Sequence, residues 1–282
     1  MHLLRSLLFC AASLLAGAAR PADEVPDPLA ELTERAQAHR VLLVGELHGS
    51  WEVPGIVAGL ATNLLADERP LLVGLEIWRS EQAALDRYLA SAGTGEDRER
   101  LLAGPFWATR DGRSSEAVVA LIERLRALAL KAPLAVVAFD IEAESDITGA
   151  ERDRSMGELL LARLESMPDA RLLVLAGNFH TRIQSGAPWD PAHDFMGHFL
   201  REQDPYAVEI MGVKGSTWMC PDPEHCRAWQ MPEAPFEPGL TLGDTLNDRR
   251  HHGVWWLPQI SASPPATGAD EALLQPLPLK GD

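Results

Sequence analysis

The sequence has little positive charge, and this scarcity argues against several classes of partner. Its 282 residues include 25 Lys and Arg against 41 Asp and Glu, which gives a formal net charge of −16. A nucleic-acid-binding surface needs basic side chains that displace counterions from phosphate, and anionic membranes attract the same side chains. We therefore expect neither a nucleic acid nor an anionic membrane surface as partner.

Long apolar runs are also missing after the first residues. A membrane-spanning helix needs about 20 consecutive apolar residues, and no stretch beyond residue 19 approaches that length. Residues 1–19 combine a short basic start, an apolar run over 7–15 and a small-residue pattern at 16–18, as a cleaved export signal does. We expect a periplasmic or secreted protein that is soluble after cleavage and not stably inserted in a membrane.

Several common motifs are missing too. The sequence has no G-x-S-x-G element, no Walker loop, no Rossmann G-x-G-x-x-G and no H-E-x-x-H pair. The first three are typical of serine hydrolases, NTPases and nicotinamide enzymes. We therefore expect the protein to belong to none of these three classes.

Cysteine is scarce, with three residues in the chain. Cys10 lies in the expected export signal, which leaves Cys220 and Cys226 in a proline-containing turn. An oxidising compartment favours a disulfide between them. The alternative is a metal site that uses both thiols and His225, but the spacing suits a zinc site poorly and a second ligand pair is missing. We expect the disulfide.

From residue 27 onward, short apolar runs alternate with amphipathic segments, which predicts an α/β fold with a mostly parallel sheet and helices on both faces. Four of the five expected strands are almost wholly apolar, as strands buried on both faces are. The strands are expected at 40–46, 71–76, 134–140, 171–176 and 206–213. The helices are expected at 53–68, 115–130, 150–167 and about 191–203.

Local signals support two of these helices. Thr148 with Glu151 three residues later predicts a capping box at the start of the helix at 150–167. Asp190 followed by Pro191 predicts the start of the helix that runs to about residue 203.

We expect a single domain over residues 20–262. Glycines and aromatic residues in 92–113 predict an excursion with a short helix that forms part of a lid. Residues 214–282 are rich in proline and contain no long amphipathic segment. They predict an irregular, strand-poor region that ends in a flexible tail over 263–282.

Polar residues follow four of the expected apolar strands, at or just after the point where each strand ends. Because the carboxyl ends of parallel strands lie along one edge of a sheet, and ligands bind at that edge, these side chains predict one functional crevice. An Arg at 152 or 154 is placed to pair with Asp140 or Glu142. The expected lining residues are Glu46, His48, Glu76, Asp140, Glu142, Asn178 and His180.

Four further histidines predict less. His193 and His198 are five residues apart, so they do not share a helix face and at most one faces the crevice. His251 and His252 lie beside two arginines, which favours a surface cluster over a ligand role.

The segments Gly45-Glu46-Leu47-His48-Gly49, Leu75-Glu76 and Ala176-Gly177-Asn178-Phe179-His180 resemble the ChaN-type haem-binding uptake proteins. That family belongs to a wider superfamily with the Tiki/TraB proteases and the erythromycin esterases. The resemblance covers roughly residues 36–212 and implies an α/β sheet with a pocket at the strand ends. The positions that match are Glu46, His48, Glu76 and His180.

The resemblance implies two functions. One is the handling of haem, iron or another divalent metal (Mn, Co or Zn), with His48, Glu76 and His180 as metal ligands. The other is hydrolysis of an ester or a peptide, in which the same three residues activate water with or without a metal ion. In either case Glu46, Asp140, Glu142 and Asn178 are expected to contact the ligand.

Haem binding depends on the resemblance alone. An axial Tyr, His, Met or Cys must stand beside a broad apolar face, and the only tyrosines are Tyr88 and Tyr206. The sequence leaves open whether the partner is haem or another small molecule, and it does not indicate an oligomeric state.

Overall fold

A computed structural model describes residues 27–142, 146–221 and 225–278. The expected export signal over residues 1–19 lies outside these ranges. No helix within them is long and apolar enough to cross a membrane.

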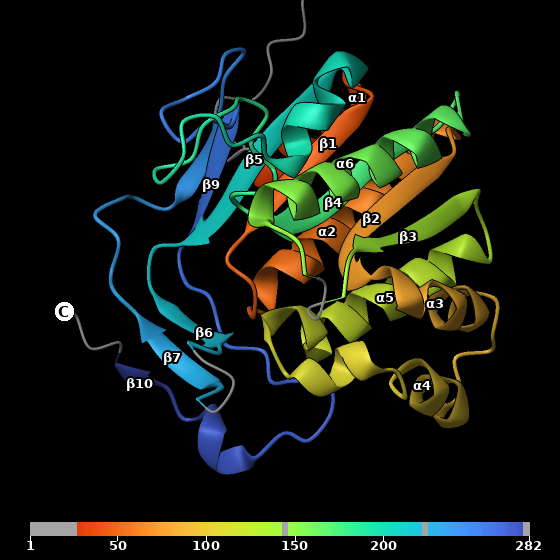
Figure 1. The fold of residues 1–282 in the computed structure, drawn as a ribbon, viewed down its shortest axis with the longest axis vertical. Helices are drawn as coiled ribbons and strands as arrows, with labels where there is room; N and C mark the ends of the chain where they lie inside the picture. Colours follow the sequence, from red (N-terminus) through yellow and green to blue (C-terminus); the bar gives the residue numbers. More distant parts are fainter. Residues whose placement is uncertain (1–26, 143–145, 222–224, 279–282) are drawn as a thin grey trace, which may run out of the picture.

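A seven-stranded sheet forms the centre of the molecule (Figure 1), in the order β3-β2-β4-β1-β5-β9-β8. Every neighbouring pair is parallel except β8 and β9, which are antiparallel. The strands are β1 (Val41–Glu46), β2 (Leu71–Trp78), β3 (Leu134–Asp140), β4 (Arg171–Gly177), β5 (Pro205–Gly212), β8 (Gly239–Leu242) and β9 (Gly253–Leu257). The five strands that we predicted are therefore confirmed, with ends that differ by one or two residues.

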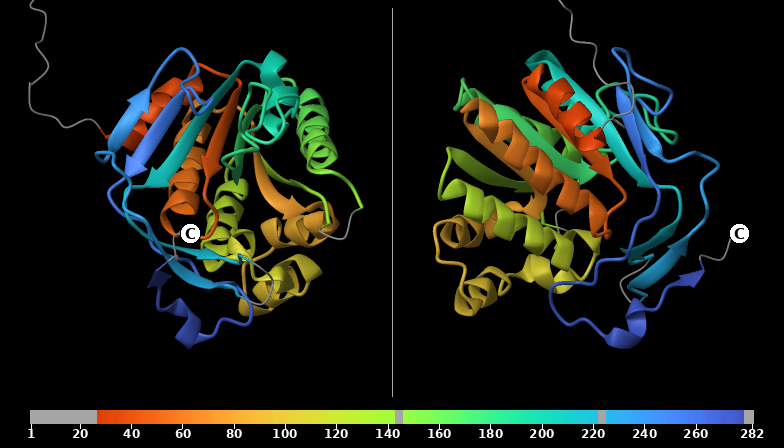
Figure 2. Two further views of the ribbon diagram at one scale, coloured as in Figure 1. Left: turned by 60° about the vertical axis from the view of Figure 1, so that its left-hand side comes forward. Right: turned by 180° about the vertical axis from the view of Figure 1, so that it is seen from behind.

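Helices cover both faces of this sheet, as expected. Alternate strand residues face two separate hydrophobic clusters, because successive side chains of a strand point to opposite faces. One cluster joins the sheet to α1, α2, α3 and α5, and the other joins it to α6. Figure 1 looks onto α6, and the view from behind in Figure 2 looks onto α1, α2 and α5. The helices are α1 (Pro28–Gln37), α2 (Glu52–Leu64), α3 (Gln82–Leu89), α4 (Gly95–Leu101), α5 (Glu116–Ala129) and α6 (Gly149–Glu165).

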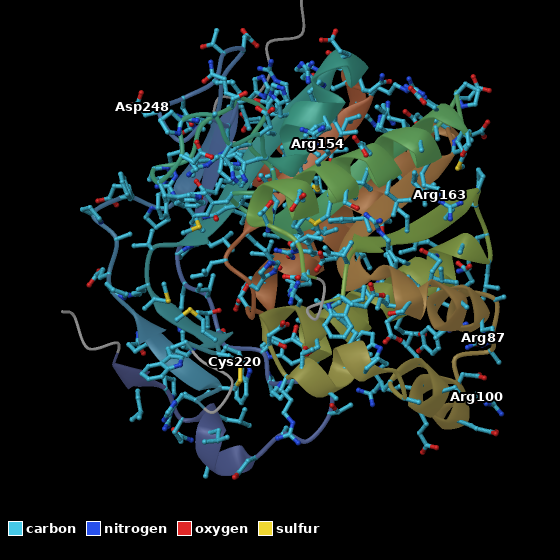
Figure 3. All side chains as sticks on the ribbon, in the orientation of Figure 1. Arg87, Arg100, Arg154, Arg163, Cys220 and Asp248 are labelled. Carbon is cyan, nitrogen blue, oxygen red and sulfur yellow. A yellow bond between two sulfur atoms is a disulfide. The ribbon has the colours of Figure 1, made fainter. Side chains whose placement is uncertain are left out.

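Charged side chains of both signs lie on the molecular surface. Arg87, Arg100 and Asp248 are exposed on three different parts of the chain (Figure 3). The acidic groups that matter for the site are instead buried at the edge of the sheet, as described below.

The capping box at the start of α6 is confirmed, since the Thr148 side chain accepts from the Glu151 amide and Glu151 accepts from the Thr148 amide. The helix expected over 191–203 is wrong in its first half. Only Met196–Gln203 is helical, as the 3₁₀ helix η5. An α-helix would need the Gly197 amide to donate to the His193 carbonyl. That carbonyl accepts from Gly186 instead, and Gly197 donates to His180.

The expectation of a strand-poor C-terminal region is also wrong. Short strands β8 and β9 extend the main sheet, and β6 (Gly215–Met219), β7 (Arg227–Met231) and β10 (Leu277–Pro278) form a second one. Ser263 is buried and its amide donates to the Gly49 carbonyl. The packed part of the chain thus continues past residue 262, where we expected the flexible tail to begin.

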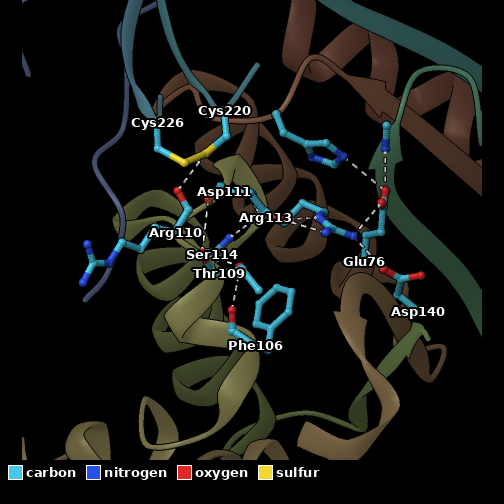
Figure 4. A network of polar contacts seen from close by, with 12 residues as sticks. Glu76, Phe106, Thr109, Arg110, Asp111, Arg113, Ser114, Asp140, Cys220 and Cys226 are labelled. Atoms are coloured by element: carbon cyan, nitrogen blue, oxygen red, sulfur yellow. Dashed lines mark hydrogen bonds and ion pairs between the residues drawn. A yellow bond between two sulfur atoms is a disulfide. The ribbon is translucent and has the colours of Figure 1, made fainter. Parts of the chain in front are cut away.

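The disulfide between Cys220 and Cys226 is confirmed. It closes the hairpin of β6 and β7, and Figure 4 shows it beside Arg110. Because both sulfur atoms are bonded to each other, the alternative metal site with His225 is ruled out. The excursion over 92–113 contains the expected short helix, α4. Its last two residues begin the 3₁₀ turn η4 (Gly112–Ser114), which brings Arg113 to the edge of the sheet.

Candidate functional site

The carboxyl ends of β1 to β4 carry a cluster of polar side chains. Glu46 is the last residue of β1 and pairs in register with Gly177, the last residue of β4. Asp140 ends β3 and is in register with Trp78 of β2, after a bulge that follows Leu75. The bulge lies beside Glu76, whose carboxylate is central to the cluster. Glu46, Glu76 and Asp140 are all buried.

His48 lies between two of these carboxylates. Its Nδ1 is 2.9 Å from Glu46 Oε1, and its Nε2 is 3.2 Å from Glu76 Oε2. The Thr217 hydroxyl of β6 donates to the His48 carbonyl at 2.6 Å, so the C-terminal hairpin fixes the backbone at this position. With an acceptor at each ring nitrogen, the imidazole is set up to carry both protons.

The two carboxylates also determine whether the His48 imidazole is charged. Burial lowers the pKa of His48, but the charge of Glu76 and the hydrogen bonds to Glu46 and Glu76 outweigh it and raise the pKa to about 10. Burial has the opposite effect on a carboxyl group and raises the pKa of Glu46. The hydrogen bond and the charge of His48 lower that pKa but do not outweigh burial. His48 is therefore an imidazolium ion at neutral pH.

His180 is held in the opposite hydrogen-bonding state. Its Nδ1 is 2.6 Å from Asp153 Oδ1, and its Nε2 is 3.2 Å from Nη1 of Arg152. A guanidinium group can only donate, so His180 Nε2 is the acceptor in that contact and Nδ1 carries the hydrogen that Asp153 accepts. The Nε2 lone pair therefore points away from Asp153, as it does in the His-Asp pair of a serine protease.

Asp153 is a member of this candidate site that the sequence did not reveal. It is buried in α6 and also accepts from the His193 ring at 2.9 Å and from the Met196 amide at 2.9 Å. Burial raises its pKa, but the hydrogen bonds from His180 and His193 outweigh this and lower it. The available signal was its place beside Arg152, at the start of a helix that follows the acidic loop.

Two arginines complete the cluster. Arg152 contacts Asp140 at 2.8 Å and Glu76 at 2.8 Å, which confirms that an arginine at the start of α6 pairs with Asp140. Arg113 donates to Asp140 at 2.6 Å, and Figure 4 shows it beside Glu76, Asp140 and Asp111. Burial raises the pKa of Glu76, but the positive charge of His48, its hydrogen bond to Glu76 and the charge of Arg113 outweigh it and hold that pKa well below its usual range.

Two of the expected residues have other partners. Asn178 lies beside the cluster and lines the cavity described below, but its amide donates to Glu209 Oε1 at 2.8 Å. Glu142 accepts from the Ser80 amide and lines a neighbouring cavity of about 260 Å³. The structure therefore brings together Glu46, His48, Glu76, Asp140 and His180, and places Asn178 at the rim and Glu142 outside the cluster.

A cavity of about 330 Å³ opens onto the cluster and gives a ligand access to both imidazole rings. It is bounded by charged groups on one side and by Leu47 and Phe179 on another. The remaining lining residues are Glu46, His48, Glu76, Arg113, Arg152, Gly177, Asn178 and His180.

Gly177 lies close to both imidazole rings, which yields a prediction. A Cβ atom there would lie 3.1 Å from His48 Nε2, 3.4 Å from His180 Cδ2 and 3.7 Å from Glu76 Oε2. Gly177→Ala should therefore shift the rings by a few tenths of an ångström and, for the ester hydrolysis that the resemblance implies, lower kcat/KM about tenfold, without a loss of melting temperature. Gly55→Ala, where a Cβ meets nothing within 4 Å, is the control. Unchanged kinetics in Gly177→Ala would contradict this geometry.

The set His48, Glu76 and His180 does not suit a metal ion. Among the described residues, no group of three or more His, Cys, Asp and Glu is arranged to hold one. Both nitrogens of His48 face carboxylates, His180 Nε2 faces a guanidinium, and Glu76 accepts from Arg152 and from the Gly177 amide. A histidine that binds a metal ion needs a free nitrogen lone pair. The positive charge of the Arg152 guanidinium beside His180 Nε2 also repels a metal ion. The expected metal site is therefore not supported.

The two tyrosines cannot supply an axial haem ligand in this cavity. Tyr88 is buried and donates to Glu123 at 2.9 Å. Tyr206 is buried, donates to the Gly243 carbonyl at 3.0 Å and stacks on His252. Neither lines the cavity at the strand ends.

Solved structures share this fold at low sequence identity. A succinoglycan biosynthesis protein is 12% identical with a TM-score of 0.65, and the match covers 84% of this chain and 92% of that one. An erythromycin esterase in its open conformation is 13% identical with a TM-score of 0.62, covering 83% and 94%. Haem-binding ChaN of Campylobacter jejuni is 14% identical with a TM-score of 0.43, covering 64% and 85%. The last score is too low to support assignment to the ChaN family.

No protein-family model matches the sequence, and no curated protein matches it. The solved structures therefore show a common α/β fold and leave the activity to be argued from the site.

Proposed function

We propose that the protein is a metal-independent hydrolase that adds water to an ester or amide bond. The observation that carries this proposal is the pair of histidines in opposite states on one cavity. His48 is an acid, protonated between Glu46 and Glu76, and His180 is a base, oriented by Asp153. An imidazole with an acceptor at each nitrogen can serve as an acid, and an imidazole that keeps the lone pair of one nitrogen can serve as a base, so the two hydrogen-bonding patterns suit these two roles.

The roles of the residues follow from their positions. His180 Nε2 takes a proton from a water molecule that accepts a hydrogen bond from Arg152, and the water oxygen attacks the carbonyl carbon. Arg113 and Arg152 stabilise the oxyanion that develops. The carbonyl then re-forms as the bond from the carbon to the leaving oxygen or nitrogen breaks, and His48 Nε2 gives its proton to that leaving atom; Glu46 and Glu76 keep the ring protonated until that step. After the products leave, the proton held by His180 passes through water to His48, which restores both rings.

The fold shared with an erythromycin esterase supports this proposal over haem or iron handling. A His/Glu site of this kind activates water without a nucleophilic serine, which agrees with the missing G-x-S-x-G element. We also propose that the protein is exported. The disulfide supports that location.

The test is hydrolysis of a panel of 4-nitrophenyl esters and peptide anilides by protein treated with EDTA. We expect turnover that persists after chelation and does not increase when Zn²⁺, Mn²⁺ or Fe²⁺ is added. Turnover that disappears with EDTA and returns with one metal would contradict the proposal, as would no turnover of any substrate together with stoichiometric haem binding.

The pH profile should reveal His48. Since the pKa of His48 is raised to about 10, kcat/KM should stay level up to pH 9 and fall as the pH rises through about 10, after correction for spontaneous hydrolysis. His48→Gln should remove this alkaline limb together with most of the activity, and His198→Gln should keep it. A limb that persists in His48→Gln would assign the proton to another group.

The same raised pKa has a consequence for stability. The free ring titrates near pH 6.5, so the ion pairs of His48 contribute fully to folding below about pH 6.5. Their contribution is lost as the pH rises through about 10. The difference in unfolding free energy between wild type and His48→Gln should therefore shrink with rising pH over that range.

A further inference from the structure

Trp189 is an exposed aromatic residue in a loop that backbone hydrogen bonds close. Its side chain is 65% exposed, more than any other large hydrophobic residue in the described part of the chain. The loop is closed by reciprocal hydrogen bonds between Ala187 and Asp190, and by one from the Gly186 amide to the His193 carbonyl at 2.8 Å. This exposed indole also contacts the rings of Phe179 and Phe195, so it is part of an aromatic cluster and not an isolated surface residue.

The indole is continuous with the apolar wall of the cavity. The ring of Trp189 lies 5.3 Å from the ring of Phe179, and Phe179 lines the 330 Å³ cavity beside His180. The guanidinium of Arg182 lies 4.1 Å from the centre of the Phe179 ring, which fixes that ring in place. Phe179 and Trp189 thus form an apolar platform that runs from the site to the surface.

The same loop is tied to the proposed base. His193 belongs to it, bonds to Asp153 at 2.9 Å and packs edge-on against Trp189. Asp153 in turn holds His180 at 2.6 Å. A group that rests on the platform is therefore placed beside the residue that would activate water.

We propose that Phe179 and Trp189 bind an apolar ring or chain on the acyl side of the substrate. The substrate class is then an ester or amide with a bulky hydrophobic acyl group, instead of a small polar one. This inference rests on the proposed function for the reaction, but the binding site itself can be tested without turnover.

The kinetic test uses two esters with the same leaving group, 4-nitrophenyl acetate and 4-nitrophenyl phenylacetate. Wild type should prefer the phenylacetate in kcat/KM. Trp189→Ala should lower that preference, the ratio of kcat/KM for the phenylacetate to kcat/KM for the acetate, about tenfold, and Trp189→Phe should restore most of it. Phe236→Ala is the matched control, because Phe236 is 48% exposed and stacks on Trp256 instead of Phe179.

The binding test uses phenylacetamide, titrated by calorimetry into wild type and the three variants. We expect a Kd that rises at least fivefold in Trp189→Ala and is unchanged in Phe236→Ala. Equal preference and equal Kd in wild type and Trp189→Ala would overturn the inference, as would no binding of phenylacetamide. Binding that depends on Trp189 in a protein that hydrolyses neither ester would support the inference and contradict the proposed function.

Discussion

Replacement of His180 by asparagine should lower kcat for ester hydrolysis about a thousandfold. The asparagine amide can occupy the place of Nδ1 and still donate to Asp153, which now accepts from Nδ1 at 2.6 Å. What it lacks is an atom at the position of Nε2, the proposed proton acceptor. His180 is at the cavity and partly exposed, so the melting temperature should change little.

Initial rates over a range of substrate concentrations, together with melting curves, would check this result. His198→Asn is the control, because His198 is a partly exposed histidine on a nearby segment that does not line the cavity. Asp153→Asn should also lower kcat by at least a hundredfold, since the His180 ring loses its charged partner. A His180→Asn protein that keeps a tenth of the activity would exclude His180 as the base.

Replacement of Asp140 by alanine should destabilise the fold by about 3 kcal/mol. This carboxylate is fully buried and accepts from Arg113 at 2.6 Å, from Arg152 at 2.8 Å and from the Ile141 amide at 2.8 Å. Its removal leaves two guanidinium groups at the edge of the sheet with one fewer counter-charge. Both arginines are partly exposed, so water can solvate them after the replacement. The loss of unfolding free energy should therefore be at the low end of the range for breaking a buried ion pair.

Urea unfolding followed by circular dichroism would measure this loss. Glu142→Gln is the matched control, since Glu142 lies two residues further on and its carboxylate accepts from the Ser80 amide; its free energy of unfolding should change by less than about 0.5 kcal/mol. If Asp140→Ala and Glu142→Gln unfold at the same urea concentration, the ion pairs of Asp140 do not stabilise the fold.

The sequence was most informative where side-chain placement depends on the strand alone. Apolar runs that are buried on both faces identify the strands, and parallel strands present their carboxyl ends together. This logic alone is enough to bring Glu46, His48, Glu76 and Asp140 to one edge of the sheet. Which of these side chains lie next to one another depends on the order of the strands in the sheet, which differs from their order in the sequence.

The partners that come from other elements could not be predicted in the same way. Asp153 and Arg113 reach the edge from α6 and from η4, and nothing in the local pattern fixes the direction of a helix side chain relative to a distant strand end. The 3₁₀ helix η5 shows the same limit, because two tertiary hydrogen bonds, at Gly186 and Gly197, replace the α-helical one that local signals favoured.

The prediction of a strand-poor C-terminal region is wrong because the strands there are short and prolines are frequent, so the sequence shows no clear strand pattern. Its β6 strand nevertheless reaches back across the chain, where Thr217 holds the carbonyl of His48, 169 residues earlier. The Trp218 amide and Ser263 amide both donate to the Gly49 carbonyl, and the Trp218 indole donates to Arg110. Figure 4 shows the disulfide at the end of this hairpin, next to the segment that carries Arg113.

This arrangement defines the smallest piece of the chain that can carry the site. A fragment that ends near residue 212 would contain His48, Glu76 and His180, but the loop after β1 would lose every one of the bonds that β6 and Ser263 supply to it. β5 would also become an edge strand without β9, open to pairing with other chains. The proposed acid and base are thus encoded in the first two thirds of the sequence, whereas the position of the loop that carries His48 depends on the final third.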